Sequence, residues 1–250
     1  MKGSIDLNAD LGEGAASEAE LLRLVSSANI ACGFHAGDPG SMSVSIRAAR
    51  ESGVAVGAHP SLMDRQNFGR KELPTTAEEV FGLVAYQLGA FQAIAGSLGV
   101  KPHHVKPHGA LYNMAARDSE LAEAVAQAIG AVDRSLILFA PGRSALARAG
   151  EAAGLPVARE VFADRNYQPD GALVPRTQSN AILHDPEEAV TRVLRMLREG
   201  VVSAIDGSEV AIEAETVCVH GDTPEAVAFA KELRQKLAAA GIKIAPPAVS

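Results

Sequence analysis

The sequence predicts a distorted seven-stranded (β/α) barrel of the TIM-like kind, and two observations lead to this fold class. Seven short runs rich in β-branched and small residues alternate with amphipathic helical stretches, the pattern of parallel strands joined by helical crossovers. Polar residues stand at the C-terminal ends of nearly all the runs, and a parallel barrel gathers those ends on one rim. The runs span residues 4–9, 27–33, 54–60, 103–109, 135–141, 157–164 and 215–221.

An open doubly wound sheet is the alternative, since it has the same alternation of strands and helices. It gathers strand ends only where the strand order reverses, whereas here the polar residues follow almost every run. Seven strands in place of eight indicate an irregular or incompletely closed barrel. The polar strand-end residues are Asn8, Asp10, His35, His59, Lys106, His108, Glu160, Asp164, His220 and Asp222.

Helix signals occupy the intervals between the runs. Ser17 with Glu20 and Thr76 with Glu79 have the spacing of capping boxes. An N-cap residue followed by proline occurs at Asp38-Pro39, Asp185-Pro186 and Thr223-Pro224. Residues 200–215 predict a small hairpin that turns at Asp206-Gly207.

Length and composition predict one domain over residues 1–250. Hydrophobic residues make up 47% of the 250 positions, which is enough for a substantial core. Neither a fixed-period repeat nor a Pro/Gly/Ser-rich linker divides the chain.

The charge pattern favours small molecules or proteins as partners. The net charge is −7 and the acidic residues are dispersed, so neither nucleic acid nor an anionic membrane is expected to bind. Cys32 and Cys218 lie far apart in apolar stretches, as reduced core thiols do. Without a signal-peptide pattern or an apolar run of about 18 residues, we expect no membrane span and a cytoplasmic location.

The first run continues into the segment DLNADLGEG, which carries candidate site residues. Strand alternation places Asp6, Asn8 and Asp10 on one side, where buried polar groups would need partners or a ligand. Glu13 stands at a turn between two glycines. The plainer interpretation is an edge strand with one solvated face.

Histidines and a lysine at the ends of the next three runs strengthen the prediction of a site. They are His35, His59, Lys106 and His108. The metal-binding spacing C-x-x-C is absent, although Asp10, His35 and His59 could meet across a barrel mouth. Whether this site binds a metal ion therefore stays open. Of the other histidines, His103 and His184 are expected at the surface, and His104 is left unassigned.

Nucleotide-binding fingerprints are also absent: neither G-x-G-x-x-G nor G-x-x-x-x-G-K-[ST] occurs. His220 and Asp222 precede a helix start at Thr223-Pro224, where backbone N–H groups suit an anion.

Seven blocks of sequence together resemble the LamB/YcsF family. They are DLNADLGEG, NIACGFHAGDP, GAHPSLMD with FGR, VKPHGALYN, EVFADRNY, LVPR and VCVHGD, in order from Asp6 to Asp222. The resemblance implies a barrel related to glycoside hydrolase and deacetylase barrels. It also implies an ATP-dependent 5-oxoprolinase activity, which opens the lactam of 5-oxo-L-proline to L-glutamate with Mg²⁺ and two companion subunits, B and C.

That reaction suggests roles for the candidate residues. A resonance-stabilised lactam needs activation by phosphorylation, a group that activates water, and cations around the phosphate. Residue type and strand position predict the catalytic groups Asp10, His59 and Lys106. The predicted substrate-binding groups are Asn8, Glu13, His35 and His108.

Two other functions use the same residues. One is a metal-dependent, deacetylase-like hydrolase that acts alone, without ATP. The other is a noncatalytic subunit whose rim binds a small carboxylate.

Overall fold

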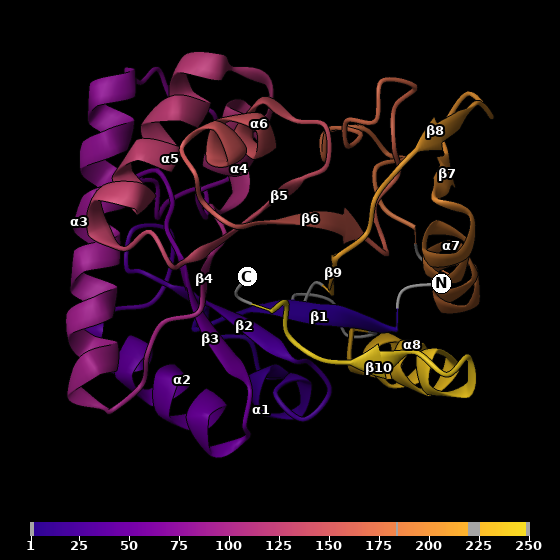
Figure 1. Cartoon of the computed structure of the whole chain (residues 1–250), viewed down its shortest axis with the longest axis horizontal. Coiled ribbons are helices and arrows are strands. Elements are labelled where there is room, and N and C mark those ends of the chain that lie inside the picture. Colours follow the sequence, from indigo (N-terminus) through magenta and orange to yellow (C-terminus); the bar gives the residue numbers. More distant parts are fainter. Residues whose placement is uncertain (1–2, 184, 220–225, 249–250) are drawn as a thin grey trace.

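Seven parallel strands close into a barrel with helices around it (Figure 1). The computed structural model describes residues 3–183, 185–219 and 226–248. The ring closes because β9 pairs with both β6 and β1, so the open doubly wound sheet is excluded and the predicted barrel is confirmed. The barrel strands, in order around the ring, are β1 (Ser4–Leu11), β2 (Ser27–Ala31), β3 (Ala55–His59), β4 (His104–Val105), β5 (Ile137–Pro141), β6 (Val157–Phe162) and β9 (Thr216–Cys218).

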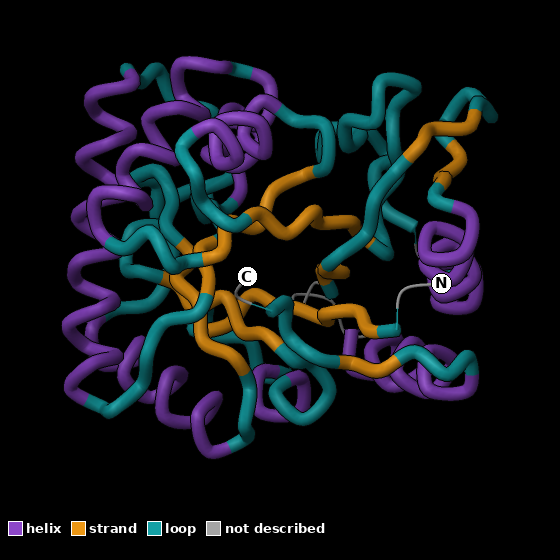
Figure 2. The backbone as a smooth tube through the Cα atoms, in the orientation of Figure 1, coloured by secondary structure: helices purple, strands orange, loops and turns teal. Residues whose placement is uncertain are grey.

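Helices form the outer layer that surrounds the strands (Figure 2). The capping box of Thr76 with Glu79 is confirmed, as are the N-caps Asp38 and Asp185. Ser17 makes no side-chain cap; Glu18 accepts the nearby backbone N–H groups instead. Thr223-Pro224 lies outside the described residues. The helices are α1 (Glu18–Leu21), α2 (Pro39–Glu51), α3 (Ala77–Ser97), α4 (Gly109–Arg117), α5 (Ser119–Val132), α6 (Ala145–Ala152), α7 (Pro186–Glu199) and α8 (Ala226–Ala239).

The predicted hairpin is confirmed as the antiparallel pair β7 (Val201–Ser203) and β8 (Glu209–Ala211). Gly207 in its turn has a φ of 85°, a left-handed conformation that favours glycine. This hairpin lies to one side of the barrel, above α7 in Figure 1.

The C-terminal segment crosses the N-terminal end of the barrel. Strand β10 (Lys243–Ile244) pairs with the start of β1, and Ala245 N donates to Ile5 O at 3.0 Å. Pro247 O accepts from His103 Nε2, also at 3.0 Å, beside the start of β4. Because β1 and β4 lie on different sides of the ring, the segment spans this end, as Figure 1 shows. The opposite rim, at the C-terminal strand ends, is where the candidate residues gather.

Strand β4 is shorter than the predicted run of residues 103–109. Two residues have strand geometry, because Pro102 and Pro107 flank them and proline has no N–H to donate. The ladder to β3 nevertheless continues, since Lys106 N donates to Ala58 O at 3.0 Å and His108 N donates to Pro60 O at 2.8 Å.

The two faces of the barrel differ in polarity. Outward-facing strand residues such as Leu7, Ile30 and Val217 belong to the apolar core beneath the helices. Inward-facing residues are largely polar, and many are buried within the ring: Asp6, Asn8, Asn29, His59, His104, Glu160 and Thr216. Ile137, Phe139 and Ala158 form a small apolar cluster separate from the main core.

Helix α3 has the length and apolar composition of a membrane span, with a mean hydropathy of 1.3. One face of α3 is buried in the main core, and its residues have the spacing of an amphipathic helix: Val80, Val84, Leu88, Phe91 and Ala95. It packs extensively against α5. These contacts make α3 part of the layer that covers the barrel.

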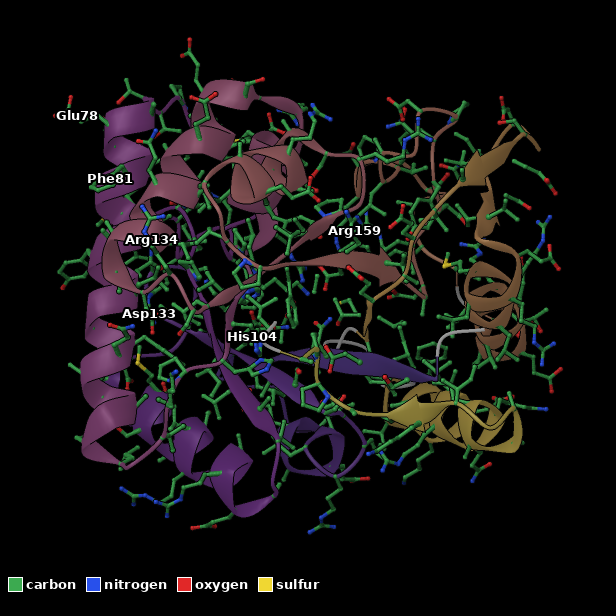
Figure 3. All side chains as sticks on the ribbon, viewed as in Figure 1. Glu78, Phe81, His104, Asp133, Arg134 and Arg159 are labelled. Atoms are coloured by element: carbon green, nitrogen blue, oxygen red, sulfur yellow. The ribbon has the colours of Figure 1, made fainter. Side chains whose placement is uncertain are left out.

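Gly57 makes room for a buried imidazole inside the barrel. A Cβ at this position would lie 2.2 Å from the ring of His104, which stacks on Phe139 with 4.2 Å between ring centroids. His104 lies among the strands near the centre of Figure 3. The backbone of Gly57 needs no unusual φ, so space alone requires glycine here.

We expect Gly57→Ala to lower the free energy of unfolding by about 2 kcal/mol or more, because overpacking a buried site costs about 1–3 kcal/mol. Gly82→Ala, on the exposed face of α3 with open space around its added Cβ, is the control and should gain about 0.5–1 kcal/mol. Urea unfolding measures both. Equal stabilities of the Gly57 variant and the parent chain would contradict the packing argument.

Candidate active site

A buried lysine joins several strands inside the barrel. Lys106 follows β4 and is 3% exposed. Its Nζ lies 3.1 Å from Asp10 Oδ1 and 2.9 Å from Glu160 Oε1. It also lies 3.2 Å from Asn8 Oδ1 and 3.1 Å from Cys218 Sγ. Burial acts to lower the pKa of Lys106, but the Asp10 carboxylate and the other neighbours raise it well above its ordinary value, so the amine is charged.

Glu160 on β6 is the second anchor of this lysine. Its Oε1 accepts from Asn8 Nδ2 at 2.9 Å, and its Oε2 accepts from the Tyr112 hydroxyl at 2.6 Å. Burial and the adjacent Glu160 raise the pKa of Tyr112 well above its ordinary value, so this hydroxyl remains a donor. The sequence places Glu160 at a strand end but does not assign it or Tyr112 to the site; the register of β6 against β9 brings Glu160 inward.

Asn29 and His104 connect Asp10 to the middle of the barrel. Asn29 Nδ2 donates to Asp10 Oδ1 at 2.9 Å and to Asn8 Oδ1 at 2.7 Å. His104 Nε2 donates to Asn29 Oδ1 at 2.8 Å. Burial lowers the pKa of His104 well below its usual value, so this ring is neutral. His104 therefore supports Asp10 through Asn29.

Asp6 lies deepest on the polar face of β1. Its carboxylate accepts from the hydroxyls of Ser26 at 2.6 Å, Ser27 at 2.8 Å and Thr216 at 2.5 Å. Burial raises the pKa of Asp6 to about 6, and these hydrogen bonds only partly oppose the shift. Asp6 therefore titrates close to neutral pH.

One glutamate and three histidines meet at the C-terminal rim: Glu13, His35, His59 and His108, called here the rim cluster. One ligand-type atom from each residue lies within 4.8 Å of all the others. His35 Nε2 is 2.8 Å from Glu13 Oε1, and His59 Nε2 is 2.9 Å from His108 Nδ1. Asp10 Oδ2 adjoins the cluster, 3.4 Å from His59 Nε2.

Backbone carbonyls determine which ring nitrogens carry hydrogen in two of these histidines. His59 Nδ1 lies 2.6 Å from Lys106 O, and His108 Nε2 lies 2.9 Å from Phe68 O. A carbonyl oxygen only accepts, so these nitrogens donate. If both rings were neutral, the two remaining nitrogens, His59 Nε2 and His108 Nδ1, would point their lone pairs at each other across 2.9 Å. The pair therefore needs a proton or another cation.

Without a metal ion, His59 carries that proton. Burial acts to lower the pKa of His59, but the carboxylates of Asp10 and Glu13 outweigh it and raise the pKa. Burial and the charge of His59 lower the pKa of His35 to about 3. They lower the pKa of His108 well below its ordinary value. Two neutral rings, His35 and His108, thus stack on each other and both contact the imidazolium of His59 edge-on.

A strained loop holds the cluster from the outside. Phe68 has a φ of 55° and Gly69 a φ of 63°, and left-handed backbone at a bulky residue such as Phe68 is uncommon. A Cβ on Gly69 would lie 2.8 Å from His35 Cβ and 2.9 Å from His108 Cδ2. The loop therefore approaches both rings closely, and it carries the carbonyl that orients His108.

All seven predicted site residues lie in one connected network. They are Asn8, Asp10, Glu13, His35, His59, Lys106 and His108. Glu160, Tyr112, Asn29 and His104 extend it, and sequence patterns assign none of these four to the site. His220, Asp222 and His184 lie outside the described residues. His103 is half-buried, which differs from the expected surface position because it contacts the C-terminal segment.

The closed parallel barrel and its polar C-terminal rim define the class of (β/α)-barrel proteins that carry their site at that rim. The model of the LamB/YcsF family matches residues 5–250, and the chain belongs to this family.

Comparison with known proteins agrees on family and fold. The chain is 52% identical to the A subunit of 5-oxoprolinase from Methylococcus capsulatus, over 98% of this chain and 96% of that protein. It superposes on the crystal structure of a lactam utilization protein from Thermus thermophilus with a TM-score of 0.91 and 44% identity, over 98% of this chain and all of the other. A family 4 carbohydrate esterase from Streptomyces lividans has a TM-score of 0.50 at 13% identity, over 98% and 99% of the two chains, so the predicted relation to deacetylase barrels holds at the level of fold.

The shifted pKa of Asp6 predicts how stability depends on pH. The ordinary pKa of 3.8 applies to the unfolded chain and about 6 to the folded one, so the folded state binds this proton more tightly. The contribution of Asp6 to stability then rises as pH falls from 7 toward 4, by about 1 kcal/mol between pH 7 and pH 5. Comparing urea unfolding of the parent chain and Asp6→Asn at both pH values isolates this contribution. A stability difference that does not change with pH would contradict it.

Proposed function

We propose that this chain is the A subunit of an ATP-dependent 5-oxoprolinase, which hydrolyses the lactam of 5-oxo-L-proline to L-glutamate together with companion subunits B and C. The observation that carries the proposal is the 52% identity, over 98% of the chain, to a protein named as the A subunit of 5-oxoprolinase. The name of the Thermus structure, a lactam utilization protein, supports the same substrate class.

The chemistry of the substrate explains the need for ATP. Resonance makes the carbonyl carbon of an unstrained lactam a poor electrophile. Transfer of the γ-phosphoryl group to the lactam oxygen, with release of ADP, removes that resonance. Water then adds to the carbon, and cleavage of the C–N bond leaves an acyl phosphate. A second water hydrolyses the acyl phosphate to the side-chain carboxylate of glutamate and free phosphate. Mg²⁺ would accompany ATP and neutralise charge on its phosphates.

The groups at the rim suit the hydrolytic half of this reaction. We assign proton transfer from water to Asp10, which lies 3.4 Å from His59 Nε2 and is partly open, with 13% of its side chain exposed. In the metal-free site, protonated His59 would return a proton to the departing lactam nitrogen. Glu13, His35 and His108 would orient the substrate from the same rim, and Asn8 would hold Asp10 in place through Asn29.

Lys106 suits a positioning role better than direct contact with substrate. Its ammonium group has four polar neighbours, Asn8, Asp10, Glu160 and Cys218, and is nearly inaccessible. We therefore propose that its charge holds the Asp10 carboxylate in the correct orientation, and adds a positive potential beneath the reacting carbonyl.

A second candidate function is favoured by the rim cluster alone: a metal-dependent amide hydrolase that acts without ATP. Such a site would activate water on a bound cation. ATP-independent hydrolysis by the isolated chain would favour this candidate.

We expect the purified chain to form little glutamate from 5-oxoproline with ATP, and the addition of the B and C subunits to produce ATP-dependent turnover. A phosphorylated lactam exposed to bulk water would hydrolyse unproductively, so a closed site between subunits is physically sensible. The measurement is glutamate and phosphate release with each component omitted in turn. Full ATP-coupled turnover by this chain alone would refute the need for partners.

We expect Asp10→Asn to lower kcat of the assembled enzyme by about a hundredfold or more, because the variant removes a positioned proton acceptor. The matched control is Glu72→Gln, which removes an exposed carboxylate paired with Arg117 and should leave kcat unchanged. Both variants should keep a cooperative thermal transition. Wild-type turnover in Asp10→Asn would exclude this residue as the proton acceptor.

A further inference from the structure

We propose that the rim cluster of Glu13, His35, His59 and His108 is a binding site for one divalent transition-metal ion, with zinc as the favoured ion. The proposal depends on the donor geometry of this chain and not on the proposed reaction. Within the described residues, one ligand-type atom from each of these four side chains lies within 4.8 Å of all the others.

The spacing of the donor atoms fits a tetrahedral ion. Bonds of about 2.0–2.1 Å in a tetrahedron place neighbouring ligand atoms about 3.3 Å apart. The distances found here lie on both sides of that value: 2.8 Å for His35 Nε2 to Glu13 Oε1, 2.9 Å for His59 Nε2 to His108 Nδ1, 3.6 Å for Glu13 Oε1 to His108 Nδ1 and 3.9 Å for Glu13 Oε1 to His59 Nε2. The rings of His35 and His108 are stacked, with 3.8 Å between their centroids, so one of these rings must tilt for both lone pairs to face the ion.

The groups behind the donors support the same conclusion. Metal-binding histidines usually donate their second ring N–H to a carbonyl or carboxylate, which aims the free lone pair at the ion. His59 does so to Lys106 O and His108 does so to Phe68 O. The lone pairs that face each other at 2.9 Å are then those that a cation would share. A proton can bridge only two of the four donors, whereas a metal ion binds all of them.

The donor set also indicates the class of ion. Three imidazoles and one carboxylate suit zinc and its first-row neighbours, whereas Mg²⁺ prefers oxygen ligands in an octahedral arrangement. The rim cluster would therefore be separate from any Mg²⁺ that accompanies ATP. Asp10, 3.4 Å from His59 Nε2, would stand beside the ion.

His35 differs from the other two histidines. Its Nδ1 is buried and has no hydrogen-bond partner among the residues that the structure describes. If Nε2 binds the ion, Nδ1 carries a hydrogen without an acceptor there, so His35 should be the weakest of the three ligands. Loss of His35 should raise the Kd less than loss of His108.

The test is metal binding by the full chain, purified without a polyhistidine tag and stripped with a chelator. Zn²⁺ titrated against a chromophoric competitor should bind at one equivalent per chain, and Co²⁺ should give the intense visible absorption of a tetrahedral complex. Glu13→Gln and His108→Gln should raise the Zn²⁺ Kd by about 100-fold or more, since even groups behind the ligands contribute 10–100-fold. The control is His103→Gln, a histidine outside the cluster, which should bind like the parent chain.

Two results would overturn the proposal: no binding at tens of micromolar Zn²⁺, or the same Kd in all three variants. If His108→Gln does not fold, Glu13→Gln decides the matter, because its side chain is the most accessible of the four. Zn²⁺ should raise the Tm of the parent chain and of His103→Gln, and that increase should be lost in Glu13→Gln. Metal binding by a chain that shows no 5-oxoprolinase activity even with ATP and the B and C subunits would reject the proposed reaction and leave the metal site standing.

Discussion

The buried ammonium ion of Lys106 is the interaction on which the polar interior depends. It extends from the end of β4 across the barrel to Asp10 on β1 and Glu160 on β6. Removing one partner of a buried ion pair costs about 3–5 kcal/mol, because the remaining charge is left unpaired in a medium of low polarity. The three strands must therefore keep the register that holds these charges in contact. Asn8 reinforces that register, since its amide bonds both Glu160 and the neighbouring Thr216.

The alternation of side chains along each strand separates the residues that stabilise the barrel from the residues that form the site. Alternate residues of β1 face outward into the apolar core beneath the helices, and the residues between them face the polar interior. A polar interior costs free energy unless its groups form hydrogen bonds or ion pairs. Such contacts connect the interior groups in a continuous series from Asp6 to the rim. The apolar outer layer supplies the stabilisation that offsets the cost of such an interior. The same strand can therefore hold the fold on one face and a site on the other.

Sequence patterns predict the strands, the hairpin and the participation of seven site residues, because strand periodicity and strand-end position are local properties. Register is not local. Glu160 enters the site through the pairing of β6 with β9, and His104 fits inside the barrel because it lies opposite Gly57. The short β4 follows from its two flanking prolines, a signal present in the sequence. The approach of Phe68 and Gly69 to the histidines depends on a loop conformation that no periodicity encodes.

Charge balance relates the interior to the rim. Asp10, Glu13 and Glu160 present three carboxylates to this region, and Lys106 supplies one positive charge against two of them. The third lies among three imidazoles, where the lone pairs of His59 and His108 already require a cation between them. A protonated His59 meets that requirement with one charge, and a divalent ion would meet it with two. This requirement explains the strained backbone of Phe68, whose carbonyl orients His108. The carbonyl keeps the Nδ1 lone pair of His108 directed at the position where positive charge is needed.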